Sequence, residues 1–542
     1  MRLTNWRVWL IMTHRWMGIA LGLMLAIWTI SGLVLMYVGL PHLTAGERLA
    51  RLPALNVDSV TVSPAEAAAA VGADPFRIRL SMYGDRPVYR VNTGNVFGRW
   101  TLVYADTGEV FEGFDQHSAL AWLEGFVPEA AGRMTIDAYL TGPDLYTHNP
   151  GLQTHMPMYR IALNDRSGTE FYVSEHTGEA VLKTTRNTRL LGFIGYDLHT
   201  LFFFRQQSWW TPLLEWLAWS ALAMVLLGVV LGFWRYSNKP RFHRRTAPSR
   251  SPYRGLLKWH HFAGLIFGAF VVSWLFSGLV SLLAVPGIFE TFYTPAQIAA
   301  GARSVQGQGP DLPLDSITVP MVRAAADAVA KEFAATEIEL ISFGGQPYWI
   351  AHRKPNPQEV AEWHSMSAFD FIAPTLDHDH RLVDARAPDA GALLRLSDEQ
   401  VLAAAQLAMP GANVTATEWV YEYDAYYYPR HTSFDLGLPQ PVRSLPVLRV
   451  KFDDAEQTWL YLNPDYAQMV KFESTDRINR WAYYGLHSLD FGFLFSRRPV
   501  WDALVITLVF GGCILSTTTL LPAFRRLRRH LVNGLGGGVQ NR

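Results

Sequence analysis

The sequence has very little cysteine and no surplus of either charge. Its 542 residues include one cysteine, Cys513, which excludes an internal disulfide, a cysteine-ligated iron–sulfur cluster and covalently attached c-type haem. The 47 basic residues equal the 47 acidic residues in number, so the chain lacks the excess of positive charge that binds nucleic acid. Charged residues make up 17% of the chain and hydrophobic residues 49%, a balance typical of a membrane protein with substantial soluble parts.

Several enzyme motifs are also missing. No G-x-G-x-x-G follows a strand-like run, and neither a Walker lysine motif nor H-E-x-x-H occurs. The chain is therefore not expected to bind NAD or hydrolyse ATP by itself.

Four stretches contain no Asp, Glu, Lys or Arg and are each long enough to cross a bilayer, which needs about 20 apolar residues. They are residues 16–46, 216–234, 259–289 and 503–524. The first is longer than the apolar region of a signal peptide and lacks a clear cleavage site, so we expect it to be retained.

Basic residues set the predicted orientation. The basic segments are the N-terminus before the first span, residues 235–258 with eight Lys/Arg and no acid, and FRRLRRH after the last span. We therefore predict a multi-pass membrane protein, with both termini cytoplasmic and two large domains outside. The predicted boundaries are 1–40 (transmembrane helix 1), 41–205 (first periplasmic domain), 206–236 (helix 2), 237–256 (basic loop), 257–286 (helix 3), 287–496 (second periplasmic domain), 497–524 (helix 4) and 525–542 (basic tail).

The two halves repeat one pattern. THRWMGIALGLMLAIWTISGL (13–33) matches WHHFAGLIFGAFVVSWLFSGL (259–279), which aligns His14 with His260 and Ser31-Gly32-Leu33 with Ser277-Gly278-Leu279. Later in each half, Leu-His-Thr-Leu around His199 and Leu-His-Ser-Leu around His487 stand about a dozen residues before Pro212 and Pro499. A parallel repeat of this kind predicts a pseudo-twofold axis along the membrane normal.

The outer segments have the pattern of small α+β domains. Helical periodicity marks VSPAEAAAAV, VRAAADAVAKEFA and SDEQVLAAAQLAM, of which the first and third open with serine N-caps. Strand-like runs follow each, including WTLVYADTGEVFEG, TEFYVSEHTGEAV and TWLYLNPDYAQMV, and D-T-G-E and H-T-G-E are predicted to form turns between antiparallel strands.

These units with their T-G-E turns resemble PepSY domains, and the H-x-x-x-G helices and L-H-[ST]-L motifs resemble the PepSY-associated transmembrane family. The resemblance covers nearly the whole chain. It implies four transmembrane α-helices in a pseudo-twofold bundle with two periplasmic α+β PepSY-type domains. It also implies a similarity to ferrioxamine-type ferric-siderophore reductases, which contain haem b.

The repeated histidines are the candidate cofactor ligands, because a histidine in a membrane helix is costly unless it faces a partner. His14 and His260 are expected near one membrane face, and His199 and His487 near the other. Two such pairs fit two haems b per chain, each iron taking two imidazoles as axial ligands. His261, beside His260, is the alternative ligand in its half, although the repeat aligns it with Arg15.

Glycines follow both first-helix histidines at i+4 and i+8. They are Gly18, Gly22, Gly264 and Gly268, and their missing side chains are expected to leave space for a porphyrin. The same spacing is also common in plain helix packing. Arg15 and Lys258 are expected to meet haem propionates on the cytoplasmic side, and Arg205, Arg497 and Arg498 on the other.

Two other clusters are weaker candidates. LDHDHRLVD offers His378, Asp379, His380 and Asp384 as metal ligands, but alternate residues of a strand point to opposite faces. EYDAYYYPRH gathers four tyrosines with Arg430 and His431, which fits either a site for a planar anionic chelate or an ordinary domain interface.

The resulting hypothesis is an inner-membrane di-haem b electron-transfer protein, acting as a haem-dependent metal reductase. Its predicted partners are the lipid bilayer, a ferric siderophore or another periplasmic oxidant, and a donor that is a quinol, a reduced flavin or a partner protein; nucleic acid is excluded. A second hypothesis is a non-redox, membrane-anchored PepSY module that binds or regulates a protease. The acceptor, the donor and the oligomeric state are left open.

Overall fold

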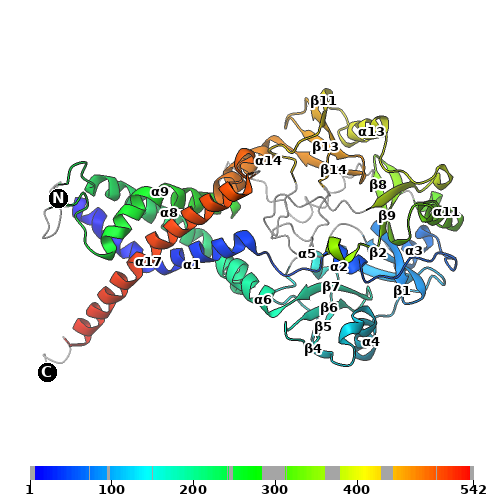
Figure 1. Ribbon diagram of the computed structural model, residues 1–542, viewed down its shortest axis with the longest axis horizontal. Coiled ribbons are helices and arrows are strands. Elements are labelled where there is room, and N and C mark those ends of the chain that lie inside the picture. The colour runs from blue at the N-terminus through cyan, green and yellow to red at the C-terminus, as the bar shows by residue number, and fades with distance from the viewer. Residues whose placement is uncertain are drawn as a thin grey trace. The chain divides into compact units, whose positions relative to one another are not determined.

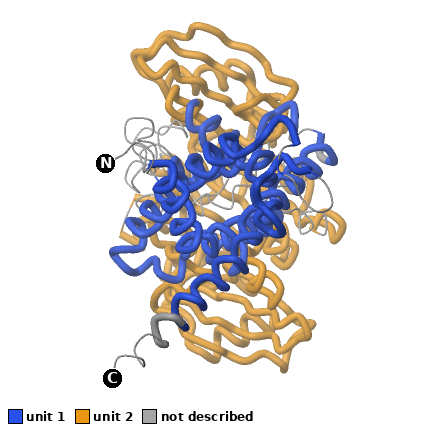
Figure 2. Tube along the Cα trace, turned by 90° about the vertical axis from the view of Figure 1, so that its left-hand side faces the viewer, with its two compact units in different colours: residues 1–37, 193–292, 478–542 blue, residues 38–192, 293–477 orange. Residues whose placement is uncertain are grey.

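The computed structural model contains long helices and three β-sheets (Figure 1). It describes residues 6–72, 74–93, 98–148, 150–240, 242, 248–282, 312, 314–360, 379–428, 443–495 and 497–536. The chain divides into two compact units, coloured separately in Figure 2. We call them the membrane unit (residues 1–37, 193–292 and 478–542) and the sheet unit (residues 38–192 and 293–477).

Four long apolar helices make up most of the membrane unit. They are α1 (Trp6–Tyr37), α8 (Trp210–Arg235), α9 (Leu256–Ser281) and α17 (Arg498–Gly536). Each is long and apolar enough to cross a membrane, so the prediction of four spans is confirmed. Their shared core includes Leu25, Ala221, Leu279 and Leu515, while large side chains such as Trp216 and Phe510 remain exposed on the outside, as lipid-facing residues must.

A short irregular segment precedes α8 and another precedes α17. The first comprises the π-helix η2 (Phe193–Asp197), α7 (Leu198–Thr200) and η3 (Phe202–Phe204). The second comprises α14 (Ser474–Asn479), the π-helix η6 (Arg480–Gly485), α15 (Leu486–Ser488) and α16 (Gly492–Phe495). The L-H-[ST]-L motifs lie in α7 and α15, just outside the long helices.

The sheet unit is built on three antiparallel sheets. The first has the order β10-β9-β8-β1-β2-β3, the second β4-β5-β6-β7 and the third β11-β12-β13-β14. The strands of the first half are β1 (Pro75–Tyr83), β2 (Arg86–Thr93), β3 (Trp100–Tyr104), β4 (Thr135–Leu140), β5 (Met158–Ala162), β6 (Glu170–Ser174) and β7 (Glu179–Thr184). Those of the second half are β8 (Ala335–Phe343), β9 (Gln346–Arg353), β10 (His380–Asp384), β11 (Val414–Val420), β12 (Val447–Phe452), β13 (Trp459–Asn463) and β14 (Gln468–Phe472).

One sheet joins the two halves of the chain. β1 pairs with β8 in antiparallel register, with Ile78 opposite Leu340 and Leu80 opposite Ile338. All four side chains are buried in one apolar core. The two outer segments, expected as separate domains, thus share a backbone ladder and a core.

Helices cover these sheets and begin where the sequence places their caps. Ser63 and Ser397 form capping boxes at the starts of α3 (Pro64–Val71) and α13 (Asp398–Ala408), as predicted. The middle predicted helix, α11 (Val319–Ala330), begins earlier than expected and ends before its last predicted residues. The other helices among the described residues of this unit are α2 (Ala45–Leu49), α4 (Gln116–Phe126), η1 (Pro128–Ala130), α5 (Pro150–Gln153), α6 (Arg186–Gly192), η4 (Leu314–Ser316) and η5 (Pro388–Ala390).

The two T-G-E turns have different outcomes. H-T-G-E joins β6 to β7, as predicted, with Gly178 at a positive φ of 56°. D-T-G-E follows β3, and the chain returns only as an isolated bridge between Val103 and Val110. There the strand prediction was too long.

Glu179, the last residue of H-T-G-E, belongs to a buried ionic cluster. Arg79 donates to Glu179 at 2.8 Å, and Arg48 holds Glu337 through two hydrogen bonds of 2.7 Å. Burial opposes the charge on Glu179, but the surrounding arginines prevail and lower its pKa to about 2. Such a cluster fixes which strands pair more than it adds stability, because each buried charge is costly to desolvate.

Candidate functional site

His14 and His260 lie side by side in the membrane unit, on α1 and α9. Their ring centres are 6.3 Å apart, with 32° between the ring planes. The Nδ1 of His14 is 3.0 Å from the carbonyl oxygen of Met224 on α8, and the Nδ1 of His260 is 2.9 Å from that of Leu515 on α17. The two halves therefore hold their histidine in the same way, each through the other long helix of that half.

His199 and His487 form a second pair, on α7 and α15. Their ring centres are 6.2 Å apart and their planes nearly perpendicular, at 87°. The Nδ1 of His199 is 3.0 Å from Ser31 Oγ, and the Nδ1 of His487 is 2.9 Å from Ser277 Oγ. Each histidine thus contacts the first long helix of its own half.

These partners determine the tautomer of the imidazoles. A carbonyl oxygen can only accept, so Nδ1 of His14 and of His260 carries the proton. Ser31 donates its own hydroxyl proton to the carbonyl of Ile27 at 2.7 Å, and Ser277 to that of Ser273 at 2.8 Å. The serine oxygens are then acceptors for Nδ1–H of His199 and His487, by the same reasoning.

In this neutral tautomer the lone pair lies on Nε2, which is the nitrogen that would bind a metal. An acceptor behind Nδ1–H is the usual arrangement around metal-binding histidines, because it orients the ring and raises the basicity of the ligand.

The backbone around the second pair is unusual in both halves. A π-helical turn precedes each histidine, in η2 and in η6. Leu201 and Leu489 follow two residues later with positive φ of 49° and 52°, a conformation that residues other than glycine rarely adopt. Such strained positions concentrate at functional sites, where the surrounding packing holds them.

Gly228 on α8 is a site residue that the sequence did not reveal. A Cβ at this position would lie 2.6 Å from Cε1 of His14, too close for any side chain. Gly32 makes a related but looser contact, because its Cβ would lie 3.3 Å from Cε1 of His199. The repeated Ser-Gly therefore receives a role: in both halves the serine binds the imidazole, and on α1 the glycine also makes room for it. On α9 a Cβ at Gly278 would lie 4.0 Å from Cε1 of His487, an ordinary contact distance.

The four glycines predicted to leave space for a porphyrin are close to other helices instead. A Cβ at Gly268 would lie 2.7 Å from Val229 on α8, and one at Gly22 would lie 3.4 Å from Thr519 on α17. Gly18 and Gly264 face Met224 and Leu515, at 3.9 and 3.5 Å. In this structure Gly268 in particular serves close helix packing, the alternative explanation of its spacing.

His261 points elsewhere and uses both ring nitrogens. Its Nδ1 is 2.8 Å from Ser251 Oγ and its Nε2 is 2.9 Å from the carbonyl oxygen of Gly232. Neither nitrogen is left for a metal, which favours His260 as the ligand of this half. Among the predicted propionate partners, Arg15 contacts Met12 Sδ at 3.4 Å, and Arg205 lies over the ring of Phe202.

Asp197 is a further residue that the sequence did not single out. It is fully buried two residues before His199, and neither carboxylate oxygen has a hydrogen-bond partner among the described residues. Burial raises the pKa of Asp197 to about 7.

The pair geometry suits a six-coordinate haem iron. Each metal–imidazole bond is about 2 Å and each nitrogen lies about 1 Å from its ring centre, so two axial imidazoles have centres about 6 Å apart. The observed 6.3 and 6.2 Å match this separation. The donors also fit, since neutral imidazoles are common axial ligands of haem b iron.

The other candidate clusters have structural partners. Asp379 pairs with Arg353 at 2.9 Å, and His380 stacks on Tyr466 with ring centres 3.8 Å apart. Tyr427 is buried and stacks on Tyr461. His378, Arg430 and His431 lie outside the described residues. Within the described part of the chain, no group of three or more His, Cys, Asp or Glu side chains is arranged to hold a bare metal ion.

Comparison with known proteins places this architecture in a family. A search of curated proteins found no similar sequence. The family model described as the PepSY-associated TM region matches residues 11–526, which is nearly the whole chain. That span includes α8 and α9, most of α1 and α17, and both histidine pairs. The chain therefore belongs to the family of PepSY-associated transmembrane proteins.

Proposed function

We propose that the protein carries electrons across the membrane through two haems b. His14 and His260 would bind one haem, and His199 and His487 the other. The observation that carries the proposal is the two histidine pairs, each joining one histidine from each half, with ring centres 6.3 and 6.2 Å apart. Each bound haem would supply one-electron redox chemistry between ferric and ferrous iron.

The residues of the chain decide what such a cofactor can do. Two imidazoles would hold each iron and leave no position open for oxygen, which favours electron transfer. The hydrogen bonds from Nδ1–H to Met224, Leu515, Ser31 and Ser277 orient the four rings.

The two pairs are separated along the membrane normal. His14 and Ser31, which binds His199, are 17 residues apart on α1, equivalent to about 25 Å of helix at about 1.5 Å per residue. The pairs thus lie toward opposite ends of a span whose apolar core is about 30 Å thick. An electron entering at one pair can leave at the other side of the bilayer.

The direction of transfer follows from the basic segments. They favour cytoplasmic termini, so the His14–His260 pair would face the cytoplasm of a bacterial inner membrane and the sheet unit would lie in the periplasm. The donor is then a quinol, a reduced flavin or a partner protein, since the chain has no NAD motif. For the acceptor we propose ferric iron in a siderophore, on the resemblance to ferrioxamine-type reductases, which would make the protein a metal reductase.

The test is a set of single substitutions in the full chain. His14→Ala and His199→Ala should each remove one haem and leave the other, seen as halved absorbance in the reduced-minus-oxidised spectrum. His42→Ala is the matched control, because His42 is an exposed histidine of the sheet unit that belongs to neither pair. Full haem content in both pair variants would refute the proposed ligands. A wild-type protein without haem would favour the membrane-anchored PepSY binding module.

A further inference from the structure

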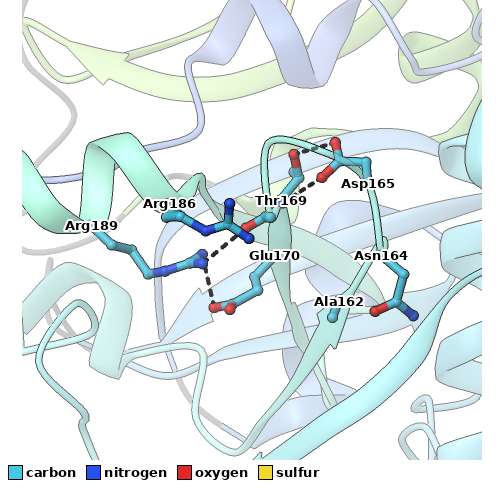
Figure 3. Close-up of a pocket in the computed structure, with 8 residues that line it drawn as sticks. Ala162, Asn164, Asp165, Thr169, Glu170, Arg186 and Arg189 are labelled. Carbon is cyan, nitrogen blue, oxygen red and sulfur yellow. Dashed lines mark hydrogen bonds and ion pairs between the residues drawn. The ribbon is translucent and has the colours of Figure 1, made fainter.

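A polar pocket of about 370 Å³ lies where the β5–β6 loop meets the start of α6 (Figure 3). Its lining comes from two short stretches of the sheet unit, residues 162–170 and 186–189. Figure 3 shows the side chains of Arg186 and Arg189 on one side of the pocket and Asp165, Thr169 and Glu170 on the other. None of these residues belongs to the histidine pairs.

Most of the charges in this pocket are already neutralised. Asp165 accepts from the backbone N–H of Thr169 at 2.8 Å and from its hydroxyl at 2.7 Å. Arg189 pairs with Glu170 at 3.2 Å and donates to the carbonyl of Gly168 at 2.9 Å. Arg186 is different: within the described part of the chain, no hydrogen bond or ion pair engages its guanidinium group, which is exposed at the pocket.

The second half of the chain separates the structural arginine from the unpaired one. There Asp454 holds Thr458 as Asp165 holds Thr169, and Arg477 donates to the carbonyl of Gln457 at 2.9 Å. Arg189 and Arg477 thus donate the equivalent hydrogen bond to the loop in the two halves. The position of Arg186 is taken by Ser474, which hydrogen-bonds Glu456. The unpaired cation therefore occurs in the first half only and is not needed for the fold of the repeat.

The pocket lies close in sequence to the membrane unit. α6 ends at Gly192, where a Cβ would be 3.2 Å from Pro41, itself four residues after the end of α1. The membrane unit begins at the next residue. Leu190 and Leu191 near the end of α6 are 56% and 36% exposed, as expected of side chains that meet lipid. Arg186 is six residues from Gly192, at most about 9 Å along the helix, so it lies near the point where the chain passes into the membrane unit.

We propose that this pocket binds the phosphate of a phospholipid headgroup, with Arg186 as the cation that recognises it. Arginine matches the oxygens of a phosphate through two parallel hydrogen bonds. The exposed leucines would lie against the acyl chains of the same lipid, which a soluble anion cannot use. The bound lipid would anchor the sheet unit at the point where the chain enters the membrane. This site is independent of the proposed haems.

The test measures lipid binding to the full-length protein in detergent by native mass spectrometry. The probes are dioctanoyl phosphatidylglycerol, dioctanoylglycerol without the phosphate, and inorganic phosphate. We expect the wild type to bind phosphatidylglycerol, Arg186→Gln to bind it about tenfold more weakly, and Arg186→Lys to retain part of the affinity. Arg386→Gln is the matched control, because it removes an exposed arginine elsewhere in the sheet unit.

Four results would overturn the proposal. Arg186→Gln binding like the wild type would remove the role of this residue, and an equal loss in Arg386→Gln would show a general charge effect. Equal binding of dioctanoylglycerol would leave only apolar contacts. Competition by inorganic phosphate at the same concentration as the lipid would make this a site for a soluble anion.

Discussion

Substituting Gly228 by alanine should selectively disturb the haem at His14 and His260. The new Cβ would lie 2.6 Å from Cε1 and 3.3 Å from Nδ1 of the His14 ring. Carbon atoms pack best at about 3.5–4.0 Å, so the ring must move by about 1 Å. A move of that size stretches the 3.0 Å hydrogen bond to Met224 beyond hydrogen-bond range.

The energy can be worked from these contacts. Overpacking a tight site typically costs about 1–3 kcal/mol. A midpoint of about 2 kcal/mol corresponds to roughly a thirtyfold loss in affinity for this haem. The haem at His199 and His487 should be unaffected, because the three atoms nearest to a Cβ at Gly228 all belong to His14.

The assay is the pyridine haemochrome of the purified variant, expressed per chain. Gly228→Ala should contain about half the haem of the wild type after washing in detergent. Val230→Ile is the matched control, since it adds a single carbon to the same helix at a side chain that is 60% exposed. Gly228→Ala with the haem content and spectrum of the wild type would refute the reasoning.

Three further predictions concern the serines, His261 and the ionic cluster. Ser31→Ala and Ser277→Ala should each weaken binding of the haem at His199 and His487 by about tenfold, measured by haem titration, because an imidazole loses its acceptor; unchanged affinity would argue against this tautomer. His261→Gln should keep both haems in the same spectrum, and the loss of one would make His261 a ligand. His155 lies 3.9 Å from Glu179 in the ionic cluster, and burial lowers its pKa to about 4. The unfolded chain therefore binds more protons between pH 6.5 and 4, and the free energy of unfolding should fall by up to about 3 kcal/mol as the pH drops through that window. Thermal unfolding should show this fall in the wild type and not in His155→Gln.

Much of the fold follows from local sequence features. Charge-free runs identify the long helices because the bilayer excludes charge, and Ser63 and Ser397 identify two helix starts because their side chains cap free N–H groups. The shared sheet was not predictable in this way. The pairing of Ile78 with Leu340 joins residues more than 250 positions apart, and strand partners at such distances leave no local signal.

The candidate site, too, could be predicted only in part from the sequence. The repeat identified the four histidines, and it also showed Ser31 and Ser277 without indicating what they bind. Gly228 has no comparable sequence signal, because the need for a glycine arises only where α8 passes the ring of His14. The choice between His260 and His261 likewise depended on which ring nitrogens the fold engages.

The most direct test of the account is the number of haems b in the purified wild-type protein. Reduced-minus-oxidised spectra with pyridine haemochrome quantification, after expression with ample haem and iron, should give two haems b per chain. Loss of half in His14→Ala would assign the first to its pair. A protein that contains no haem under these conditions would contradict the central claim.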